Sequence, residues 1–251
     1  MSAAPETLAE PAPASATEPS RVRGIRSYVR REGRITEAQA DALRRLWPRY
    51  GLGPLPEGEH VLPLPPLDLA AIFGRRAALG FEIGFGNGER LVQAALTRPE
   101  MDFVGAEVHR PGVGRVLQEL EKLGLDNARV MCADAVEFLR SGVAPGTFAE
   151  IVLQFPDPWH KTRHHKRRIV QPEFTAMVAT ALAPGGRFRL ATDWAPYAEH
   201  MLDVLNGEPR LRNLSPDGRF VPRPADRPLT RFENRGLRLG HEVADLEFVR
   251  I

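Results

Sequence analysis

The sequence predicts an α/β fold in which a mostly parallel β-sheet is covered by helices on both faces. From about residue 78, short continuous apolar runs alternate with stretches of helical periodicity, as expected for parallel strands that are buried on both sides. Each apolar run also ends in or beside an acidic residue. Parallel strands bring their carboxyl ends to one edge of the sheet, where ligands bind. We therefore expect a doubly wound sheet with an acidic ligand site at that edge.

Three regions are expected along the chain: a disordered tail over residues 1–20, a basic segment with a helix and a Pro-rich linker over 21–75, and a ligand-binding domain over 76–251. The tail consists largely of Ala, Pro, Glu, Thr and Ser, which cannot form a core. Thr36 and Gln39 make a capping box before an apolar pattern, so a helix of roughly three turns is expected to start there.

In the third region, strands and helices are expected to alternate. The expected strands are 78–85, 101–108, 128–134, 150–156 and 187–193. The expected helices are 88–98, 112–124, 135–142 and 171–183, the last closed by Pro184-Gly185-Gly186. Residues 246–251 (LEFVRI) are expected to add a further strand at an edge.

The composition limits the classes of protein to which the chain can belong. The 251 residues are 43% hydrophobic and 26% charged, which is ordinary for a soluble globular protein. We expect no membrane span, since no apolar run reaches about 18 residues, and no secretory signal, since the first residues lack a basic start and an apolar middle. The single Cys132 excludes an internal disulfide and fits a reducing cytoplasm.

Positive charge gathers in two clusters, although the net charge is only +2. Six arginines fall in residues 21–34, and the second cluster is KTRHHKRR at 161–168. A single run of this kind is often solvated surface charge, but two runs suit a polyanion held in a defined orientation. The histidines have no acids or cysteines beside them at ligand spacing, so we expect no metal site.

The first strand end carries a glycine-rich turn, Glu82-Ile-Gly84-Phe-Gly86-Asn-Gly88. A plain structural turn is one interpretation. A dinucleotide site would place a third glycine at the position of Glu89. Two carboxylates here would repel a diphosphate, whereas Glu82 would attract a ligand with an ammonium and a sulfonium. The turn therefore favours S-adenosylmethionine.

The next strand ends supply the other expected cofactor contacts. Glu107, 19 residues after Gly88, is placed to accept from both ribose hydroxyls, a role shared with nicotinamide enzymes. Asp134 is placed to accept from the adenine amino group. Each acid taken singly also suits a helix N-cap.

The fourth strand runs into Phe155-Pro156-Asp157-Pro158-Trp159. Proline restricts its own φ and the residue before it, so the two prolines fix the direction of the Asp157 carboxylate. The second basic cluster follows at once, which suggests a methyl acceptor embedded in nucleic acid. Trp159 suits either stacking on a base or packing in the interior.

At this point the chain resembles the bacterial tRNA (guanine-N7)-methyltransferases, which are class I, Rossmann-like S-adenosylmethionine-dependent enzymes. The resemblance covers roughly residues 21–251 and shows the same order of motifs. These motifs are GFEIGFGNG, AEVHRPGVG, PDPWHKTRHHKRRIVQ, ATDWAPYAEHM and TRFENRGLRLGH.

The resemblance implies a role for each motif residue. The implied cofactor contacts are Glu82, Gly84, Gly86, Glu107, Asp134 and Asp157, with Asp157 also nearest catalysis. The implied guanine-nucleotide contacts are Lys161, Asp193, Thr230, Arg231, Phe232 and Glu233. The implied RNA contacts are Arg163, His164, His165, Lys166, Arg167 and Arg168. The implied target is the guanine at position 46 of the tRNA variable loop.

Several alternatives stay open at this level. A carboxylate accepts from both donors of the guanine Watson–Crick edge, and either Asp193 or Glu233 could supply it. Other classes are a class I methyltransferase of another nucleic acid, an NAD(P)-dependent dehydrogenase, and a non-catalytic RNA-binding protein. Both a monomer and a homodimer are compatible with the sequence.

Overall fold

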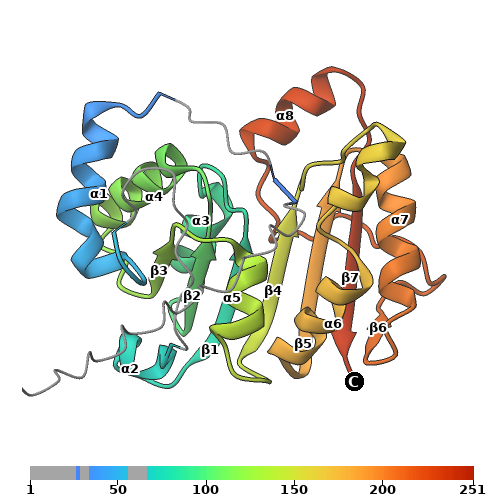
Figure 1. The fold of residues 1–251 in the computed structure, drawn as a ribbon, viewed down its shortest axis with the longest axis horizontal. Coiled ribbons are helices and arrows are strands. Elements are labelled where there is room, and N and C mark those ends of the chain that lie inside the picture. Colours follow the sequence, from blue (N-terminus) through green and yellow to red (C-terminus); the bar gives the residue numbers. More distant parts are fainter. Residues whose placement is uncertain (1–26, 29–33, 56–66) are drawn as a thin grey trace, which may run out of the picture.

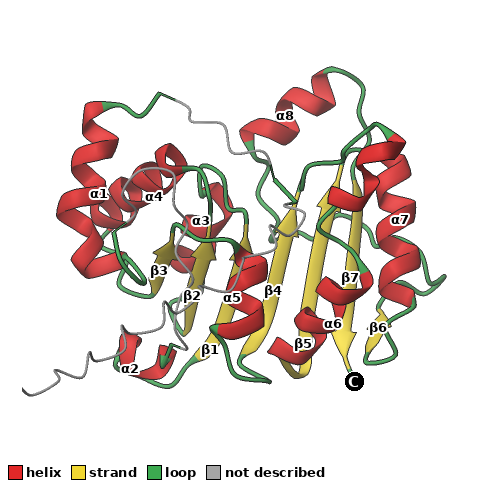
Figure 2. Cartoon of the chain, viewed as in Figure 1, coloured by secondary structure: helices red, strands yellow, loops and turns green. Residues whose placement is uncertain are grey.

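The computed structural model describes residues 27–28, 34–55 and 67–251, so the predicted tail of residues 1–20 lies outside them. One seven-stranded sheet runs through the described chain, with helices on both sides (Figure 1 and Figure 2). Its strands are β1 (Ala78–Ile83), β2 (Met101–Ala106), β3 (Ala128–Met131), β4 (Phe148–Gln154), β5 (Leu182–Thr192), β6 (Leu211–Asn213) and β7 (Ala244–Arg250).

Eight α-helices and one 3-10 helix are found in the described residues. The α-helices are α1 (Glu37–Tyr50), α2 (Leu69–Phe73), α3 (Glu89–Thr97), α4 (Arg110–Leu123), α5 (Ala135–Ser141), α6 (Pro172–Ala181), α7 (Ala195–Asn206) and α8 (Arg231–Arg238). The 3-10 helix, η1, spans Thr162–Arg167. The five strands and four helices expected after residue 78 are therefore all present.

The strand order β3-β2-β1-β4-β5-β7-β6 confirms the predicted fold class. β1 to β5 pair in parallel, whereas β7 is antiparallel to β5 and β6 is antiparallel to β7. The direction of strand succession reverses between β1 and β4. In an open α/β sheet a ligand binds outside the carboxyl ends of the strands at such a reversal. The topology thus puts the expected site above β1 and β4.

Two details differ from the sequence-based expectation. The chain passes directly from Ala181 at the end of α6 into β5, and Pro184-Gly185-Gly186 lies inside that strand. A register shift between Phe148 and Glu150 of β4 accommodates it as a bulge. The last strand, β7, is also not at an edge, because the three-residue β6 pairs with its outer side. So short a strand has too little pattern to be seen in a sequence.

Two apolar clusters hold the layers together. One joins α5, α6 and α7 to one face of the sheet, and the other joins α1, α3 and α4 to β2 and β3 on the opposite face. The predicted capping box of α1 is confirmed, since Gln39 N–H donates to Thr36 Oγ1 at 3.3 Å and Thr36 N–H donates to Gln39 Oε1 at 2.9 Å. Arg45 of α1 then pairs with Glu121 of α4. The helix of the N-terminal region therefore packs onto the sheet domain.

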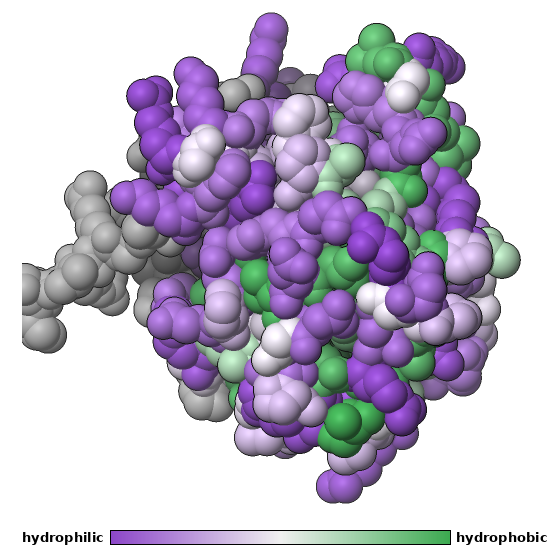
Figure 3. Space-filling model, turned by 90° about the vertical axis from the view of Figure 1, so that its right-hand side faces the viewer, coloured by the Kyte–Doolittle hydropathy of each residue, from purple (hydrophilic) through white to green (hydrophobic). Residues whose placement is uncertain are grey.

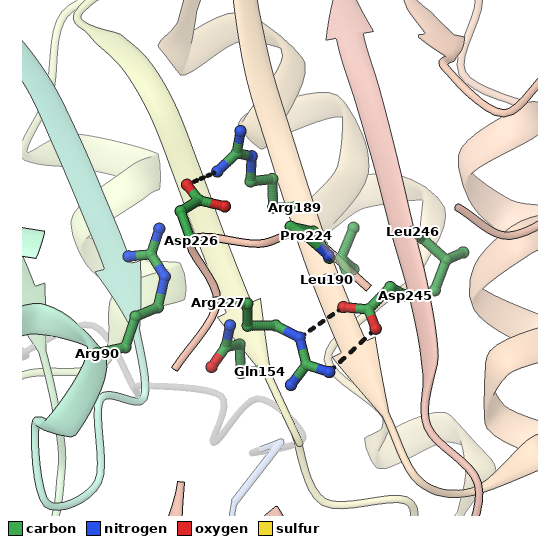
Figure 4. Close-up of a pocket in the computed structure, with 9 residues that line it drawn as sticks. All are labelled: Arg90, Gln154, Arg189, Leu190, Pro224, Asp226, Arg227, Asp245 and Leu246. Carbon is green, nitrogen blue, oxygen red and sulfur yellow. Dashed lines mark hydrogen bonds and ion pairs between the residues drawn. The ribbon is translucent and has the colours of Figure 1, made fainter. Parts of the chain in front are cut away.

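The face of the sheet that α3 covers is polar on the far side of β1, at β4 and β5. Strand side chains alternate between faces, and Glu150 of β4 and Arg189 of β5 point to this side, where they lie 3.4 Å apart. Arg90 of α3 pairs with Glu150 as well. Figure 4 shows how the loop that carries Asp226 and Arg227 lies over this face and adds further ion pairs. A buried ion-pair network therefore links α3 to the loop that precedes α8.

Candidate active site

A cavity opens at the carboxyl ends of the first four strands and holds about 720 Å³ of empty space, open solvent included. Each of these strand ends contributes to its wall, and Ser27 and Tyr28 of the N-terminal region complete it. The acids that line it are Glu107, Asp134 and Asp157. The structure therefore brings together three of the five predicted strand-end acids.

The glycine-rich turn follows β1 with Gly84, Gly86 and Gly88 at φ values of 69°, 56° and 75°. These are left-handed values that favour glycine. A Cβ on Gly88 would also lie 2.0 Å from a methyl carbon of Val116 in α4. Gly84 lines the cavity, whereas Gly86 contributes through its backbone N–H, which donates to Glu107.

Glu107 is buried and its carboxylate is fixed by the backbone. Gly86 N–H donates to Oε2 at 2.8 Å, while Val108 N–H and His109 N–H donate to Oε1 at 2.7 and 2.9 Å. A carboxylate has about four acceptor positions, so Oε2 keeps the capacity to accept from a ligand hydroxyl. The glycine turn is therefore held by a hydrogen bond to Glu107, the acid that is expected to bind the ribose.

Asp134 caps a helix and also lies in the wall of the cavity. It is the N-cap of α5, since its Oδ1 accepts from Val136 N–H at 2.9 Å, and it also lines the cavity. The N-cap role therefore does not remove Asp134 from the wall of the cavity.

Glu82 is placed differently from the expectation, because it does not line the cavity. Its side chain is 6% exposed and pairs with Arg90 at 3.3 Å, on the face that α3 covers. Burial raises the pKa of Glu82 to about 7, against the opposing effect of Arg90. Strand alternation turns Glu82 away, and its neighbours Ile83 and Gly84 face the cavity in its place. The predicted direct contact of Glu82 with a cofactor does not agree with this geometry.

The strand-four motif is held in a strained conformation. Phe155 and Trp159, which flank Pro156-Asp157-Pro158, have φ values of 49° and 47°. Such values are rare for bulky residues and cost of order 1–3 kcal/mol each. Phe155 N–H donates to Ala191 O at 2.8 Å, and this contact with β5 anchors the start of the motif. Asp157, which is exposed at the cavity, therefore lies on a strained stretch of backbone that the surrounding structure holds in one conformation.

The second basic cluster forms η1 directly after this motif. Lys161, Arg163 and Lys166 are exposed, as an RNA contact requires, and His164 and His165 are half-buried. Arg168 is different, because it is 4% exposed and donates from Nε to Pro158 O at 2.9 Å. The prediction that Arg168 contacts RNA is wrong for this reason. Its side chain instead holds the strand-four motif in place.

The N-terminal segment and the basic cluster meet at Trp159. The Trp159 ring donates from Nε1 to Ser27 O at 3.0 Å, and the Arg167 guanidinium lies 3.9 Å from the ring centre. Arg167 also donates to Tyr28 O at 3.2 Å. Trp159 was expected either to stack on a base or to pack within the protein, and the structure shows packing. Its contacts hold Ser27 and Tyr28 of the N-terminal region at the cavity.

Helix α8 carries the TRFE stretch over the same site. Thr230 caps it by accepting from Glu233 N–H at 3.2 Å, and the half-exposed Phe232 ring lies 5.2 Å from the Phe155 ring. The side chain of Arg231 lies outside the described residues. Exposed Leu229, Leu237 and Leu239 add to an apolar surface on and beside α8, which lies at the top of the molecule, where Figure 3 shows green atoms.

Glu233 is 2% exposed and is enclosed by two arginines. Arg227 donates to its two oxygens at 2.7 and 2.9 Å, and Arg223 pairs with it as well. Arg227 in turn binds Asp245 of β7 at 2.8 Å (Figure 4). A carboxylate held in this way is poorly placed to accept from a base, so of the two residues proposed to bind the guanine edge this geometry favours Asp193 over Glu233.

Asp193, the other proposed reader, follows β5 and keeps 18% of its side chain exposed. Its Oδ2 lies 3.1 Å from Nδ1 of His241. Next to it, the His160 and Trp194 rings meet edge to face at 4.3 Å, which joins the strand-four motif to the end of β5. Asp193 therefore stands between α8 and the motif that carries Asp157.

Four residues with a part in this arrangement were not singled out from the sequence: Arg90, Arg227, Asp245 and His241. Three of them are buried charges whose partners lie between 6 and 60 residues away, and no local pattern marks them. His241 belongs to the TRFENRGLRLGH motif, so its presence was visible although its partner was not. Among the described residues, no cluster of His, Cys, Asp and Glu able to hold a metal ion is found. Within the same residues, no helix has the length and apolar character to span a membrane.

Known proteins resemble this chain over most of its length. Residues 76–246 match a family model described as "Putative methyltransferase". The tRNA (guanine-N(7)-)-methyltransferase of Methylococcus capsulatus is 56% identical over 228 residues, which are 91% of this chain and 95% of that protein. The enzyme of the same name from Pseudomonas paraeruginosa is 50% identical over 251 residues, with 100% of each chain covered.

Solved structures agree on the fold. The 16S rRNA methyltransferase KamB superposes with a TM-score of 0.57 at 17% identity, over 80% of this chain and 98% of that one. A 16S rRNA (adenine(1408)-N(1))-methyltransferase from Catenulisporales acidiphilia, solved with its cosubstrate SAM, gives a TM-score of 0.51 at 17% identity, over 77% and 95%. On the identity and coverage of its sequence relatives, the chain belongs to the tRNA (guanine-N7)-methyltransferase family.

Proposed function

We propose that this protein transfers a methyl group from S-adenosylmethionine to N7 of a guanine in tRNA. The observation that carries the proposal is the position of Asp157. It lies in the wall of a cavity that also presents Glu107 and Asp134, and the exposed cations of η1 begin four residues after it. An acidic cofactor site next to a phosphate-binding surface suits a small cationic donor and a nucleic-acid acceptor.

The cavity fits S-adenosylmethionine by the chemistry of its lining. In this proposal Glu107 accepts from the ribose hydroxyls and Asp134 accepts from the adenine amino group, and both carboxylates line the cavity. Asp157 supplies negative charge at the exit of β4 for the positively charged end of the cofactor. Glu82 has an indirect role in this proposal, because it holds Arg90 at the start of α3.

Guanine N7 carries a lone pair and no proton, so no residue has to act as a base before transfer. When bound, S-adenosylmethionine supplies a methyl group activated by its positively charged sulfur. The protein contributes alignment and a partly apolar wall that includes Phe155 and Pro156. The guanine ring becomes cationic as the methyl group arrives, and the Asp157 carboxylate stabilises that charge.

Substrate recognition divides between the base and the RNA backbone. Asp193 accepts from N1–H and the amino group of guanine, whereas adenine offers a mismatched edge. Lys161, Arg163 and Lys166 bind phosphates. The choice of position 46 rests on the resemblance to the family, and the cytoplasm is the proposed location because tRNA is modified there.

The test is to incubate the purified protein with labelled S-adenosylmethionine and an unmodified tRNA transcript, and then to identify the labelled nucleoside. We expect 7-methylguanosine from the transcript with guanine at position 46 and none from a transcript with adenine there. Label in another nucleoside would contradict the proposed acceptor atom, and label that persists with adenine at position 46 would contradict the proposed position.

A further inference from the structure

His241 lies at the end of the segment that leaves α8, and its side chain reaches back to Asp193. The distance from Nδ1 to Asp193 Oδ2 is 3.1 Å. An ionised carboxylate can only accept a hydrogen bond, so Nδ1 carries the proton and donates. The main-chain N–H of His241 donates to Gly236 O at 3.1 Å, which fixes the main chain of His241 against α8.

Gly236 brings α8 close to the same carboxylate oxygen. A Cβ added to Gly236 would lie 3.2 Å from Asp193 Oδ2, closer than most side chains tolerate, and 3.7 Å from His241 Nδ1. The helix thus has a bare surface where Asp193 approaches it. His241 and Gly236 therefore both contact the surroundings of Asp193 Oδ2. His241 donates a hydrogen bond to this oxygen, and Gly236 leaves room for it because it has no side chain.

Helix α8 is itself anchored, so it can serve as a fixed support. Glu233 is buried between Arg227 and Arg223, and Arg227 is bound to Asp245 of β7. Ion pairs that are buried and fully paired are costly to break, because removing one partner leaves an uncompensated buried charge. The position of Gly236 and His241 relative to Asp193 is therefore set by the sheet.

We infer that His241 is a positioning residue that fixes the plane of the Asp193 carboxylate for guanine, with Gly236 as the surface against which the carboxylate rests. This inference rests on the proposed function. N1–H and the 2-amino group of guanine are parallel donors, and one carboxylate accepts both only in one orientation about its Cβ–Cγ bond. The hydrogen bond to Oδ2 selects that orientation, and Oδ2 keeps a second acceptor position for the base.

The experiment measures kcat/KM on two tRNA transcripts that differ only in the target nucleotide, guanine or inosine. Inosine keeps N1–H but lacks the 2-amino group. For the unaltered protein we expect a preference for guanine of about one to two orders of magnitude, the cost of leaving one acceptor unpaired. In His241→Leu the preference should fall below about threefold.

Two further variants separate positioning from general structure. His241→Asn retains an N–H donor at the same number of bonds from the main chain, and it should keep most of the preference. Gly236→Ala should lower the preference, because its Cβ would lie 3.2 Å from Asp193 Oδ2 and would displace the carboxylate. A merely structural role would lower activity on both transcripts equally and leave their ratio unchanged.

The outcomes also separate this inference from the proposed function. A preference for guanine that His241→Leu leaves intact, in a protein that does form 7-methylguanosine, would overturn the role of His241 alone. A protein that methylates neither transcript at N7 would overturn both. Affinity for S-adenosylmethionine, measured by calorimetry, should be the same in all variants.

Discussion

The guanidinium of Arg167 lies 3.9 Å from the centre of the Trp159 ring. This contact joins the basic helix η1 to the strained end of the strand-four motif, and both residues also bind main-chain oxygens of the N-terminal segment. A cation over a Trp face stabilises by about 0.5–2 kcal/mol. The pair therefore couples the basic helix η1, the proposed phosphate-binding surface, to one wall of the cavity.

Trp159→Ala should weaken binding of both tRNA and S-adenosylmethionine, by about 2- to 30-fold each, because Arg167 and residues 27–28 lose their shared support. Trp159→Phe keeps a ring but no N–H donor, so it should retain most tRNA affinity. Filter binding and calorimetry measure the two affinities. An effect on tRNA alone would contradict the coupling to the cavity.

Asp157→Ala should lower kcat by at least about 100-fold, since it removes the charge that stabilises the developing cation. Asp157 is exposed, so the melting temperature should change little. Asp157→Asn, which keeps the shape without the charge, should be nearly as inactive. An active Asn variant with normal kcat would exclude the electrostatic role.

Asp193→Asn should lower kcat/KM for tRNA by about 10- to 100-fold with cofactor affinity unchanged, because an amide presents a donor where guanine needs an acceptor. Glu233→Gln should instead lower stability, since it leaves Arg227 and Arg223 with less compensating charge. Kinetics and thermal melting together distinguish the two. Reversed results would restore Glu233 as the residue that reads guanine.

Replacing Arg163 and Lys166 by Ala should reduce the slope of log affinity for tRNA against log salt by about 1 to 2. Lys122→Ala serves as the control, because Lys122 is exposed at the last turn of α4. Arg168→Ala should leave the slope nearly unchanged and lower stability, since its buried side chain supports Pro158. An equal loss of slope in the Lys122 variant would mean that only total charge matters.

Glu82 and Glu150 share Arg90 but have opposite effects on the pH dependence of stability. Burial raises the pKa of Glu82 to about 7, so the folded protein holds a proton that the unfolded chain releases near pH 4.5. The contribution of Glu82 is therefore full below about pH 4.5 and is lost as pH rises to about 7, by about 3 kcal/mol. Burial also opposes ionisation of Glu150, but its arginine partners outweigh it and lower the pKa to about 2.

Glu82→Gln should therefore flatten the fall in the free energy of unfolding between pH 5 and pH 8, as measured by urea denaturation at each pH. Glu150→Gln is the matched control. Its stabilising contribution is present above about pH 4.5 and is lost as pH falls toward 2, so its main effect should lie below pH 5. Parallel curves for Glu82→Gln and the unaltered protein would contradict the raised pKa of Glu82.

The features predicted correctly from the sequence are those that local chemistry decides. Continuous apolar runs identify buried strands, and the Thr36 capping box identifies the start of α1, whatever the rest of the chain does. The parallel order then places Glu107, Asp134 and Asp157 at one edge. For these residues, position along a strand was enough to predict position in the site.

By itself, the sequence determined the fold class, the edge of the sheet at which the cavity lies and the family to which the chain belongs. The tertiary structure alone decided which charged side chains are available there. Glu82, Glu233 and Arg168 have the expected residue types in the expected motifs, but each is turned into the interior toward a partner. A buried charge must be paired, and its partner, such as Glu150 for Arg90 across 60 residues, is supplied only when distant segments pack together.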